Sequence, residues 1–485
     1  MLFNSQEFIF AFLPITFFIY FFLLNKRLVT GAKGFLVFSS LVFYSWWNIA
    51  YLPLILASML FNYIIGNSLN GNFSKVRVSK RILLTVGIVL NLLMLGYFKY
   101  MDFFIINFNN IFSGEIPLLH LALPLAISFF TFQQIAYLVD SFKQETAEYD
   151  FLNYALFVTF FPQLIAGPIV HHKEMMPQFA SRWNLAKNYK NIALGLFIFS
   201  IGLFKKVIIA DQFAIWATAG FDTATTLTLL EGWVTSLSYT FQLYFDFSGY
   251  TDMAIGAALL FNIKLPINFN SPYKATDIQD FWRRWHITLS RFLKDYIYIP
   301  LGGNRKGNFR TYNNLMATFI LGGFWHGAGW TFIFWGFLHG AALAVNRAWQ
   351  GLGFKMNKVL AWFITFNFVN IAWVFFRAKE WEDAVKVLKA MFGMSGIVFS
   401  SKYTEKLSFL SEYGIEFGAW LPNIDGNKSG TWIFVGLIIV LLCKNSMQLK
   451  ETFKPNKWYL LFSIIIMMYA VSNMNKLSEF LYFNF

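Results

Sequence analysis

The sequence is poor in charged residues, and this shortage narrows the classes of protein that it can encode. Only 13% of its 485 residues are charged, against about 25% in an average soluble protein. The shortage extends along the whole chain, 57% of the residues are hydrophobic, and the mean hydropathy is +0.50. The composition therefore predicts a protein embedded in the lipid bilayer, and no polar stretch is long enough for a second, soluble domain.

Cysteine is scarcer still, because Cys443 is the single one and it lies in the apolar run TWIFVGLIIVLLC. One cysteine excludes an intrachain disulfide and a cysteine-based metal cluster. The sequence also lacks a phosphate-loop pattern GxxxxGK[ST], a zinc pattern HExxH and a nucleophile elbow GxSxG. We therefore expect no metal site and no tightly bound cofactor.

Acidic residues are fewer than basic ones, 25 against 39, and the net charge is +14. In a membrane protein such an excess is typical of Lys and Arg held in cytoplasmic loops, so we expect no nucleic-acid partner. Basic residues follow the first and third apolar runs and fill the stretch 263–311, which predicts that these segments are cytoplasmic and the N-terminus is outside. The basic residues of the two loops are Lys26, Arg27, Lys33, Lys75, Arg77, Lys80 and Arg81. The stretch 211–231 carries only acidic charges and is predicted to lie outside.

Apolar runs recur along the chain and predict an all-α, polytopic membrane fold that forms one domain over residues 1–485. A spanning helix needs about 17–25 residues. The runs lie near 8–25, 34–47, 49–69, 82–98, 116–139, 151–169, 191–210, 232–262, 312–325, 330–349, 358–376, 431–443 and 457–473. Because some are short and 232–262 is long, we expect 11 to 13 membrane segments, some bent or re-entrant. Between 99 and 150 the predicted alternation of cytoplasmic and outside loops fails, so either 103–113 crosses as a short segment or one run is re-entrant.

The stretch 263–311 contains a segment with helical periodicity, FWRRWHITLSRFLKDYI. Its apolar positions share one side and its charged positions the other, which predicts an amphipathic helix at the membrane interface. The apolar side holds Trp282, Trp285, His286, Leu289, Phe292, Leu293 and Tyr296. A second amphipathic helix is predicted at 380–392, and the polar stretch 400–430 is predicted to be an extramembrane loop.

Polar residues at membrane depth are costly, so each is a candidate for function. His326 lies in the glycine-rich apolar stretch LGGFWHGAGWTFIFWGFLHG. Residue chemistry alone supports two interpretations equally, a proton acceptor and a hydrogen-bonded core histidine. For His286, on the apolar side of the amphipathic segment, and for His339, packing is the simpler interpretation. His120, His171 and His172 are interpreted as structural or loop residues.

Two carboxylates, Asp246 and Asp252, occur in YFDFSGYTDMAIG within a long apolar run. Six residues place them about 240° apart on a helix, so they do not form an acid–base pair on one face. For Asp246, orienting a histidine or arginine and forming a structural ion pair remain equally open.

Six segments resemble, in order, the membrane-bound O-acyltransferases, and within them the bacterial alginate O-acetyltransferase-like branch. The segments are SFFTFQQIAYLVD (128–140), FFPQLIAGPIVHHKEMMPQF (160–179), YFDFSGYTDMAIG (244–256), the stretch 268–305, GGFWHGAGWTFIFWGFLHG (322–340) and WVFFRAKEWEDA (373–384). Together they cover a motif-rich core, 128–384. Each alone is weak, whereas the ordered set is highly specific.

The resemblance implies an acyltransferase of the bacterial cytoplasmic membrane, built around a central tunnel. His326 would be the general base, and His286 would orient the donor or polarise its carbonyl. Trp325, Trp285, Asp246 and Arg284 would contact substrate. The donor would be acetyl-CoA or another thioester on the cytoplasmic side, and an extracytoplasmic partner would pass the acyl group to an exported polysaccharide.

Two alternatives remain. The first is the teichoic-acid D-alanylation branch of the same family, although IPLGGNR at 299–305 is more similar to the alginate branch. The second is a secondary transporter, which intramembrane His and Asp residues would suit. Inverted repeats, a common feature of transporters, are not evident.

Overall fold

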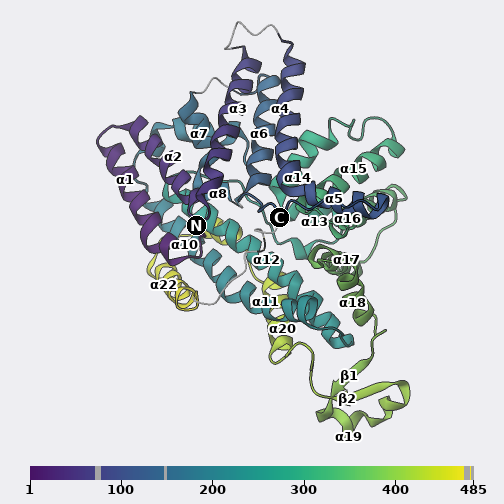
Figure 1. Cartoon of the computed structure of the whole chain (residues 1–485). Helices are drawn as coiled ribbons and strands as arrows, with labels where there is room; N and C mark the ends of the chain where they lie inside the picture. Colours follow the sequence, from purple (N-terminus) through teal and green to yellow (C-terminus); the bar gives the residue numbers. More distant parts are fainter. Residues whose placement is uncertain (72–77, 147–149, 166, 475–480, 482–485) are drawn as a thin grey trace.

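The computed structural model describes residues 1–71, 78–146, 150–165, 167–474 and 481, and these are mostly helical (Figure 1). The predicted all-α membrane fold is therefore confirmed. Lys75 and Arg77, two of the basic residues used to predict topology, lie outside the described residues. Exposed Phe, Leu, Ile and Val side chains cover the outer helices, which suits a surface in contact with lipid.

The N-terminal part of the chain forms α1 (Leu13–Asn25), α2 (Val29–Ser45), α3 (Leu52–Asn70), α4 (Lys80–Leu95), α5 (Met101–Phe112) and α6 (Ile127–Phe142). Of these, α3, α4 and α6 stand side by side (Figure 1). Three short helices follow, α7 (Phe151–Thr159), α8 (Phe161–Leu164) and α9 (His172–Ala180).

The centre of the fold is α12 (Leu229–Leu260), whose 32 residues are mostly buried. At 1.5 Å per residue it is about 48 Å long. It packs against α10 (Tyr189–Phe204), the π-helical turn η5 (Lys205–Ala210) and α11 (Asp211–Thr218). Gly202 and Gly249 let α10 and α12 meet backbone to backbone, because a Cβ on Gly202 would lie 2.5 Å from the Gly249 carbonyl oxygen.

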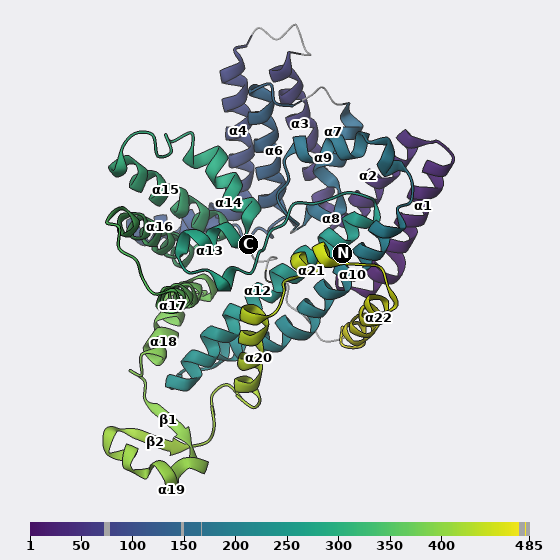
Figure 2. The ribbon, with the colours of Figure 1, turned by 180° about the vertical axis from the view of Figure 1, so that it is seen from behind.

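The remaining helices lie on either side of this centre. One group comprises α13 (Ile278–Arg284), α14 (Ile287–Leu293), α15 (Asn308–His326), α16 (Trp330–Gly351), α17 (Lys358–Arg377) and α18 (Trp381–Met391). The C-terminal helices α20 (Ser429–Leu442), α21 (Ser446–Thr452) and α22 (Lys457–Ser472) cross the face seen in Figure 2. Helix α18 confirms the amphipathic helix predicted at 380–392.

The predicted extramembrane loop 400–430 contains a small structured appendage beyond the end of α18 (Figure 1). Strands β1 (Ile397–Ser400) and β2 (Ile415–Gly418) pair in parallel with Ile397 opposite Ile415, and α19 (Thr404–Leu407) lies between them in the chain. Glu231, in the capping box that starts α12, accepts hydrogen bonds from the Asn423 backbone and side chain at 2.7 and 2.9 Å. These bonds attach the end of the appendage segment to the central helix.

Fewer helices than predicted are both long enough and apolar enough to span a membrane. Within the described residues, five are long and apolar enough to cross a membrane, or six if the bent pair α20–α21 is one span. The difference arises because several predicted runs are short helices, or helices interrupted by polar residues. Only the second half of the run 116–139 is helical, for example, since α6 begins at Ile127.

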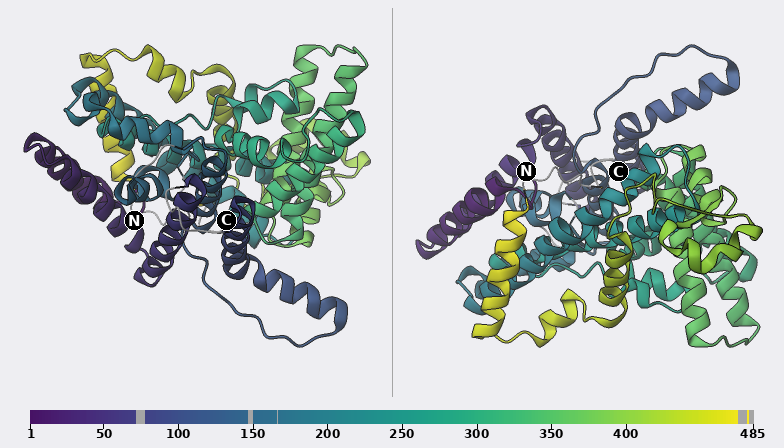
Figure 3. Two further views of the ribbon diagram at one scale, coloured as in Figure 1. Left: turned by 90° about the horizontal axis from the view of Figure 1, so that it is seen from above. Right: turned by 90° about the horizontal axis from the view of Figure 1, so that it is seen from below.

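The ambiguity between 99 and 150 has a structural answer. Helix α5 turns sideways from the end of α4 (Figures 1 and 3), and residues Lys80–Phe112 count as one candidate span. Helices α4 and α6 therefore run in opposite directions. The run 151–169 contains the two short helices α7 and α8, and the residues at its two ends lie on one side of the molecule. Lys33 bonds Asn153 at 2.9 Å, and Lys173 pairs with Glu145, just after α6, at 3.1 Å.

Candidate active site

His326 is the last residue of α15, at the point where the chain turns through Gly327–Gly329 into α16. Its side chain is buried, with 3% of the residue exposed. The Trp325, Trp335 and Phe376 rings surround it, with centroids 4.9, 5.4 and 5.0 Å from the imidazole. An imidazole at a helix end in an aromatic enclosure can exchange a proton with a bound substrate while water is kept out.

Two glycines hold the hairpin of α15 and α16 that positions His326. A Cβ on Gly323 would lie 2.3 Å from the Phe332 carbonyl oxygen, and one on Gly336 would lie 2.3 Å from the Phe319 carbonyl oxygen. Because both obstacles are backbone atoms, neither can move without separating the helices. This close packing explains why the stretch around His326 is rich in glycine.

Gly336→Ala is therefore expected to lower both the amount of folded protein and its O-acetylation activity. Overpacking of this kind costs about 1–3 kcal/mol. Gly351→Ala, in the same helix α16 but with nothing within 4 Å of the added Cβ, is the matched control. Membrane levels and specific activity of the two variants are compared, and a fully active Gly336→Ala protein would contradict the packing argument.

His286 lies at a break in the predicted amphipathic helix, so the prediction of one continuous helix was wrong. The segment forms α13 and α14, separated by Trp285 and by His286, whose φ of +43° is left-handed. Two hydrogen bonds to Asn268 make the break possible, because they satisfy backbone N–H groups at the start of α14. The Asn268 carbonyl oxygen accepts the Ile287 N–H at 3.0 Å, and its side-chain oxygen accepts the Thr288 N–H at 3.2 Å. The predicted division of the segment is seen in its burial, since most of its apolar positions are buried and its charged positions are exposed or half-buried.

The hydrogen bonds around Asn268 also determine which nitrogen of the His286 ring carries the proton. Asn268 Oδ1 accepts the backbone N–H and the hydroxyl of Thr288, so it is an acceptor when it meets His286 Nδ1 at 3.1 Å. Nδ1 therefore carries the proton, and Nε2 of the neutral ring presents a lone pair. Within the described residues this Nε2 is buried and has no hydrogen-bond partner. His286 can thus accept a hydrogen bond from a substrate, but in this form it cannot polarise a carbonyl by donation.

The structure brings His286 and His326 together, with ring centroids 6.4 Å apart, although they are 40 positions apart in the chain. Trp325 and Trp285 are both buried beside them. Trp325 touches His326 directly, whereas Trp285 packs on Phe281 and Trp373 at 5.7 and 4.9 Å. Arg284 lies apart from this centre, partly exposed and paired with Asp280 at 2.9 Å.

Asp246 and Asp252 each form an ion pair with a neighbouring lysine of η5. Asp246 lies 2.6 Å from Lys206, with both side chains 1% exposed, and Asp252 lies 2.7 Å from Lys205. Lys206 also contacts Asp211 at 3.0 Å. For Asp246, the contacts support a structural ion pair over the orientation of a histidine. The sequence signal for this network was the pair KK inside the apolar run 191–210, which the sequence analysis did not use.

Two other histidines, His339 and His120, lie in surroundings that support a structural role. His339 Nδ1 accepts the Trp282 indole N–H at 3.1 Å in an aromatic cluster, which supports the packing interpretation. His120 is exposed in the loop after α5, where its backbone N–H bonds Asp102. Within the described residues, no group of three or more His, Cys, Asp and Glu side chains lies close enough to hold a metal ion.

A series of stacked and tilted rings runs away from His326 toward a polar cluster. Trp325 stacks on Phe132 at 4.9 Å, and Phe132 stacks on Phe292 at 4.2 Å. Phe292 contacts Tyr296 at 4.8 Å, and that ring stacks on His171 at 5.7 Å. The series thus joins α15, α6, α14 and the segment before α9.

The polar cluster at the end of this series is centred on Tyr296, whose hydroxyl lies 2.8 Å from Asp140 and 3.1 Å from His171 Nδ1. Burial raises the pKa of Tyr296 above its usual range, and Asp140 raises it further, so the phenol stays protonated and donates to the carboxylate. His171 Nε2 is buried without a hydrogen-bond partner among the described residues. Sequence reasoning placed His171 in a solvated loop and missed this cluster.

Lys99 is a further residue that sequence reasoning missed. It lies in η3 (Gly96–Tyr100), between α4 and α5, and its ammonium bonds the Trp325 carbonyl oxygen at 2.6 Å and Ser128 Oγ at 3.2 Å. Its sequence signal was a lysine directly after the apolar run 82–98. Tyr100 supports the same helix end, since its hydroxyl bonds the Phe324 carbonyl oxygen at 2.9 Å.

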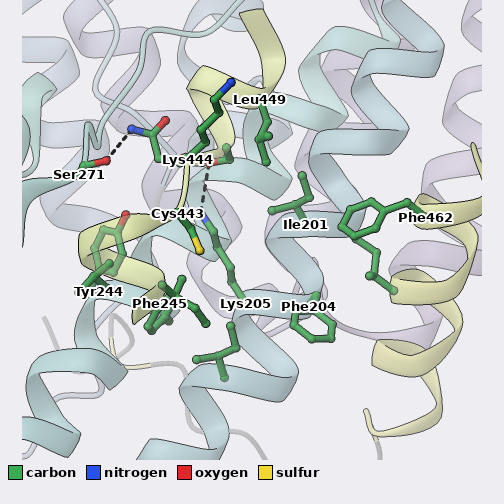
Figure 4. Close-up of a pocket in the computed structure, with 16 residues that line it drawn as sticks. Ile201, Phe204, Lys205, Tyr244, Phe245, Ser271, Cys443, Lys444, Leu449 and Phe462 are labelled. Carbon is green, nitrogen blue, oxygen red and sulfur yellow. Dashed lines mark hydrogen bonds between the residues drawn. The ribbon is translucent and has the colours of Figure 1, made fainter. Parts of the chain in front are cut away.

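A separate hollow of about 280 Å³ surrounds Lys205, between α10, α12, α20 and α22 (Figure 4). Its walls are mostly apolar, and Lys205 bonds Ser446 Oγ at 3.1 Å within it. Asn445 bonds Ser271 Oγ at 2.8 Å nearby. None of the residues proposed for catalysis lines this hollow, so we do not assign the chemistry to it.

Similarity to known proteins identifies the family of this chain. Residues 10–379 match the membrane-bound O-acyltransferase family. The chain is 52% identical to a peptidoglycan O-acetyltransferase of Helicobacter pylori, over 100% of this chain and 98% of that protein. It is 42% identical to a probable alginate O-acetylase AlgI of Pseudomonas aeruginosa, over 90% of this chain and 81% of that protein. A teichoic acid D-alanyltransferase of Bacillus subtilis is 28% identical over 53% of this chain. The chain therefore belongs to the membrane-bound O-acyltransferase family, and it is a multi-pass membrane O-acetyltransferase.

Proposed function

We propose that this enzyme takes an acetyl group from a cytoplasmic thioester, acetyl-CoA or a related donor, and passes it across the membrane for the O-acetylation of exported peptidoglycan. The observation that carries the proposal is the buried pair His326–His286 within an aromatic enclosure. Peptidoglycan is favoured over alginate because of the 52% identity to the Helicobacter pylori enzyme along the full chain.

In the proposed reaction, an acceptor hydroxyl attacks the thioester carbonyl. His326 takes the hydroxyl proton as the C–O bond forms, and gives it to the departing sulfur as the C–S bond breaks. The products are an acetyl ester and a free thiol. Positioned general-base help of this kind typically contributes about 10²–10⁴-fold to the rate. His286 lies beside it and accepts a hydrogen bond through Nε2. This bond orients either the hydroxyl that receives the acetyl group or an N–H group of the thioester substrate.

The ring series from Trp325 to His171 supports a route for the donor from the cytoplasmic side. It ends beside Lys173, Glu145 and Arg291, in the region where basic residues predict a cytoplasmic face. We propose that these rings form one wall of the predicted tunnel. An extracytoplasmic acyltransferase is the proposed partner that passes the acetyl group to the polymer, and the bacterial cytoplasmic membrane is the proposed location.

The test uses inside-out membrane vesicles and acetyl-CoA carrying a radioactive acetyl group. Label is expected in alkali-labile ester form, and its transfer is expected to require the chain. In parallel, ester-linked acetate and ester-linked D-alanine are measured on isolated peptidoglycan, alginate-like polysaccharide and teichoic acid from cells with and without the gene. Loss of acetate from peptidoglycan alone supports the proposal. A change only in D-alanine or only in the uronate polymer would refute the choice of acceptor.

A further inference from the structure

The hollow beside Lys205 lies outside the proposed catalytic centre, and its apolar walls suit the tail of a lipid. Helices α20 and α22, which form two of these walls, also carry exposed apolar side chains such as Leu442, 78% exposed, and Ile465, 57% exposed. Side chains of this kind are typical of a surface in contact with lipid. The hollow therefore lies between two helices that face the bilayer. Its apolar lining includes Ile201, Phe204, Phe245, Ile439, Val440 and Phe462.

One rim of the hollow is polar and is formed by the chain that follows α20. Cys443, Lys444, Asn445 and Ser446 line this rim, together with Ser271 of the stretch 263–311. Asn445 bonds Ser271 Oγ at 2.8 Å, so the rim lies against that stretch. Since the stretch is predicted to be cytoplasmic, the rim is the cytoplasmic side of the hollow.

The rim carries positive charge that is not neutralised within the described part of the chain. Lys444 is exposed and forms no ion pair with a described carboxylate, and Figure 4 shows its side chain extending away from Lys205. Lys274 lies nearby, because its ammonium bonds the Cys443 carbonyl oxygen at 3.0 Å, and it likewise has no described ion-pair partner. Lys205, by contrast, is neutralised by Asp252 at 2.7 Å. The rim can therefore attract an anion.

A buried hydroxyl inside the hollow also lacks a partner. Tyr244 lines the hollow and is 5% exposed, and its hydroxyl forms no hydrogen bond with another described residue. In Figure 4 this hydroxyl points toward the rim around Cys443. A buried hydroxyl without an acceptor is unfavourable. The hollow thus holds a hydrogen-bond donor that an oxygen atom of a ligand can satisfy.

We propose that the hollow binds one anionic phospholipid of the cytoplasmic leaflet. The phosphate lies at the rim near Lys444 and Lys274, an ester oxygen accepts the Tyr244 hydroxyl, and an acyl chain fills the apolar part. Basic pockets between membrane helices on the cytoplasmic side bind acidic head groups in this way. A zwitterionic lipid has no net charge for the two ammonium groups, so charge selects the lipid. The site is independent of acetyl transfer, because no residue proposed for catalysis lines it.

The experiment measures lipid binding to the purified full-length protein in detergent, after co-purified lipid has been removed. The probe is phosphatidylglycerol with a fluorescent label at the end of one acyl chain, which leaves the head group intact. Unlabelled phosphatidylglycerol, phosphatidylcholine with the same chains and soluble glycerol phosphate compete with the probe. Each interfacial lysine favours an acidic lipid about fivefold, so phosphatidylglycerol is expected to compete about 5- to 25-fold better than phosphatidylcholine.

Three variants test the residues of the site. Lys444→Gln is expected to weaken phosphatidylglycerol binding about fivefold and to leave phosphatidylcholine binding unchanged. Tyr244→Phe removes one hydroxyl and keeps the ring, and it should weaken both lipids equally because both carry ester oxygens. Lys454→Gln is the matched control, since it makes the same charge change at an exposed residue between α20 and α22 that does not line the hollow. This control should bind as the wild type does.

Two outcomes would overturn the inference without requiring any variant to fold. Equal competition by phosphatidylglycerol and phosphatidylcholine would show that the hollow takes up lipid without regard to charge. Competition by glycerol phosphate as strong as that by phosphatidylglycerol would show a site for free phosphate. Equal weakening by Lys444→Gln and Lys454→Gln would also overturn the inference, because it would show general attraction to a basic surface.

Discussion

Replacing His326 by alanine is expected to remove O-acetylation while the protein stays in the membrane at its normal level. The imidazole is enclosed by Trp325, Trp335 and Phe376, and none of these three rings can take the proton in its place. Loss of a general base alone lowers the rate by about 10²–10⁴-fold. Water admitted to the emptied space would add hydrolysis of the donor, so the measured transfer should fall to background.

The measurement is ester-linked acetate on the polymer, together with the amount of protein in the membrane. His120→Ala, in an exposed loop, is the matched control and is expected to acetylate normally. His339→Ala separates packing from chemistry, since that ring bonds Trp282 inside the aromatic cluster and its loss should lower protein level more than specific activity. Wild-type acetylation by a normally abundant His326→Ala protein would show that His326 is structural.

Lys206→Met is expected to destabilise the protein more than any surface charge substitution. Lys206 and Asp246 are both 1% exposed, and Asp211 shares the same ammonium. Removing one member of a buried ion pair leaves an uncompensated charge and costs about 3–5 kcal/mol. Here two carboxylates lose their partner, so Lys206→Met should be worse than Asp246→Asn, which leaves the Lys206–Asp211 pair in place.

Thermal unfolding of the detergent-solubilised protein gives the ranking. Lys173→Met is the matched control, because its pair with Glu145 is exposed and such pairs contribute about 0–1 kcal/mol. The double variant Lys206→Met/Asp246→Leu should recover part of the loss, since it removes the deepest unpaired charge. Equal melting temperatures for Lys206→Met and Lys173→Met would show that water reaches the pair.

The fold class and the family were predictable from the sequence because they depend on features spread along the chain. The low share of charged residues, the recurrent apolar runs and the six ordered motifs all stay recognisable where a single helix is short or interrupted. The number of spans was not predictable in the same way. The run 151–169 has the apolar length of a crossing, yet it forms the short helices α7 and α8 and returns to its starting side.

Within the site, the histidine at the end of α15 was identifiable, whereas its surroundings were not. Helical periodicity placed Trp282, His286 and Leu289 on one face, but the break at His286 depends on Asn268, 18 residues earlier in the chain. The partners of Lys99 at Trp325 are 226 residues away. Hydrogen bonds over such separations leave no periodic trace in a sequence. Single polar residues at membrane depth were the usable signal.

The left-handed backbone at His286 restricts which side chains can stand there at all. Residues branched at Cβ are strongly disfavoured at φ +43°, while His, Asn and Gly tolerate it better. An alanine at this position would combine loss of the imidazole with conformational strain. Asparagine keeps the backbone preference and removes the ring, and glycine relieves the strain and removes the whole side chain. Comparing those two substitutions therefore separates what the ring does for the reaction from what the turn does for the fold.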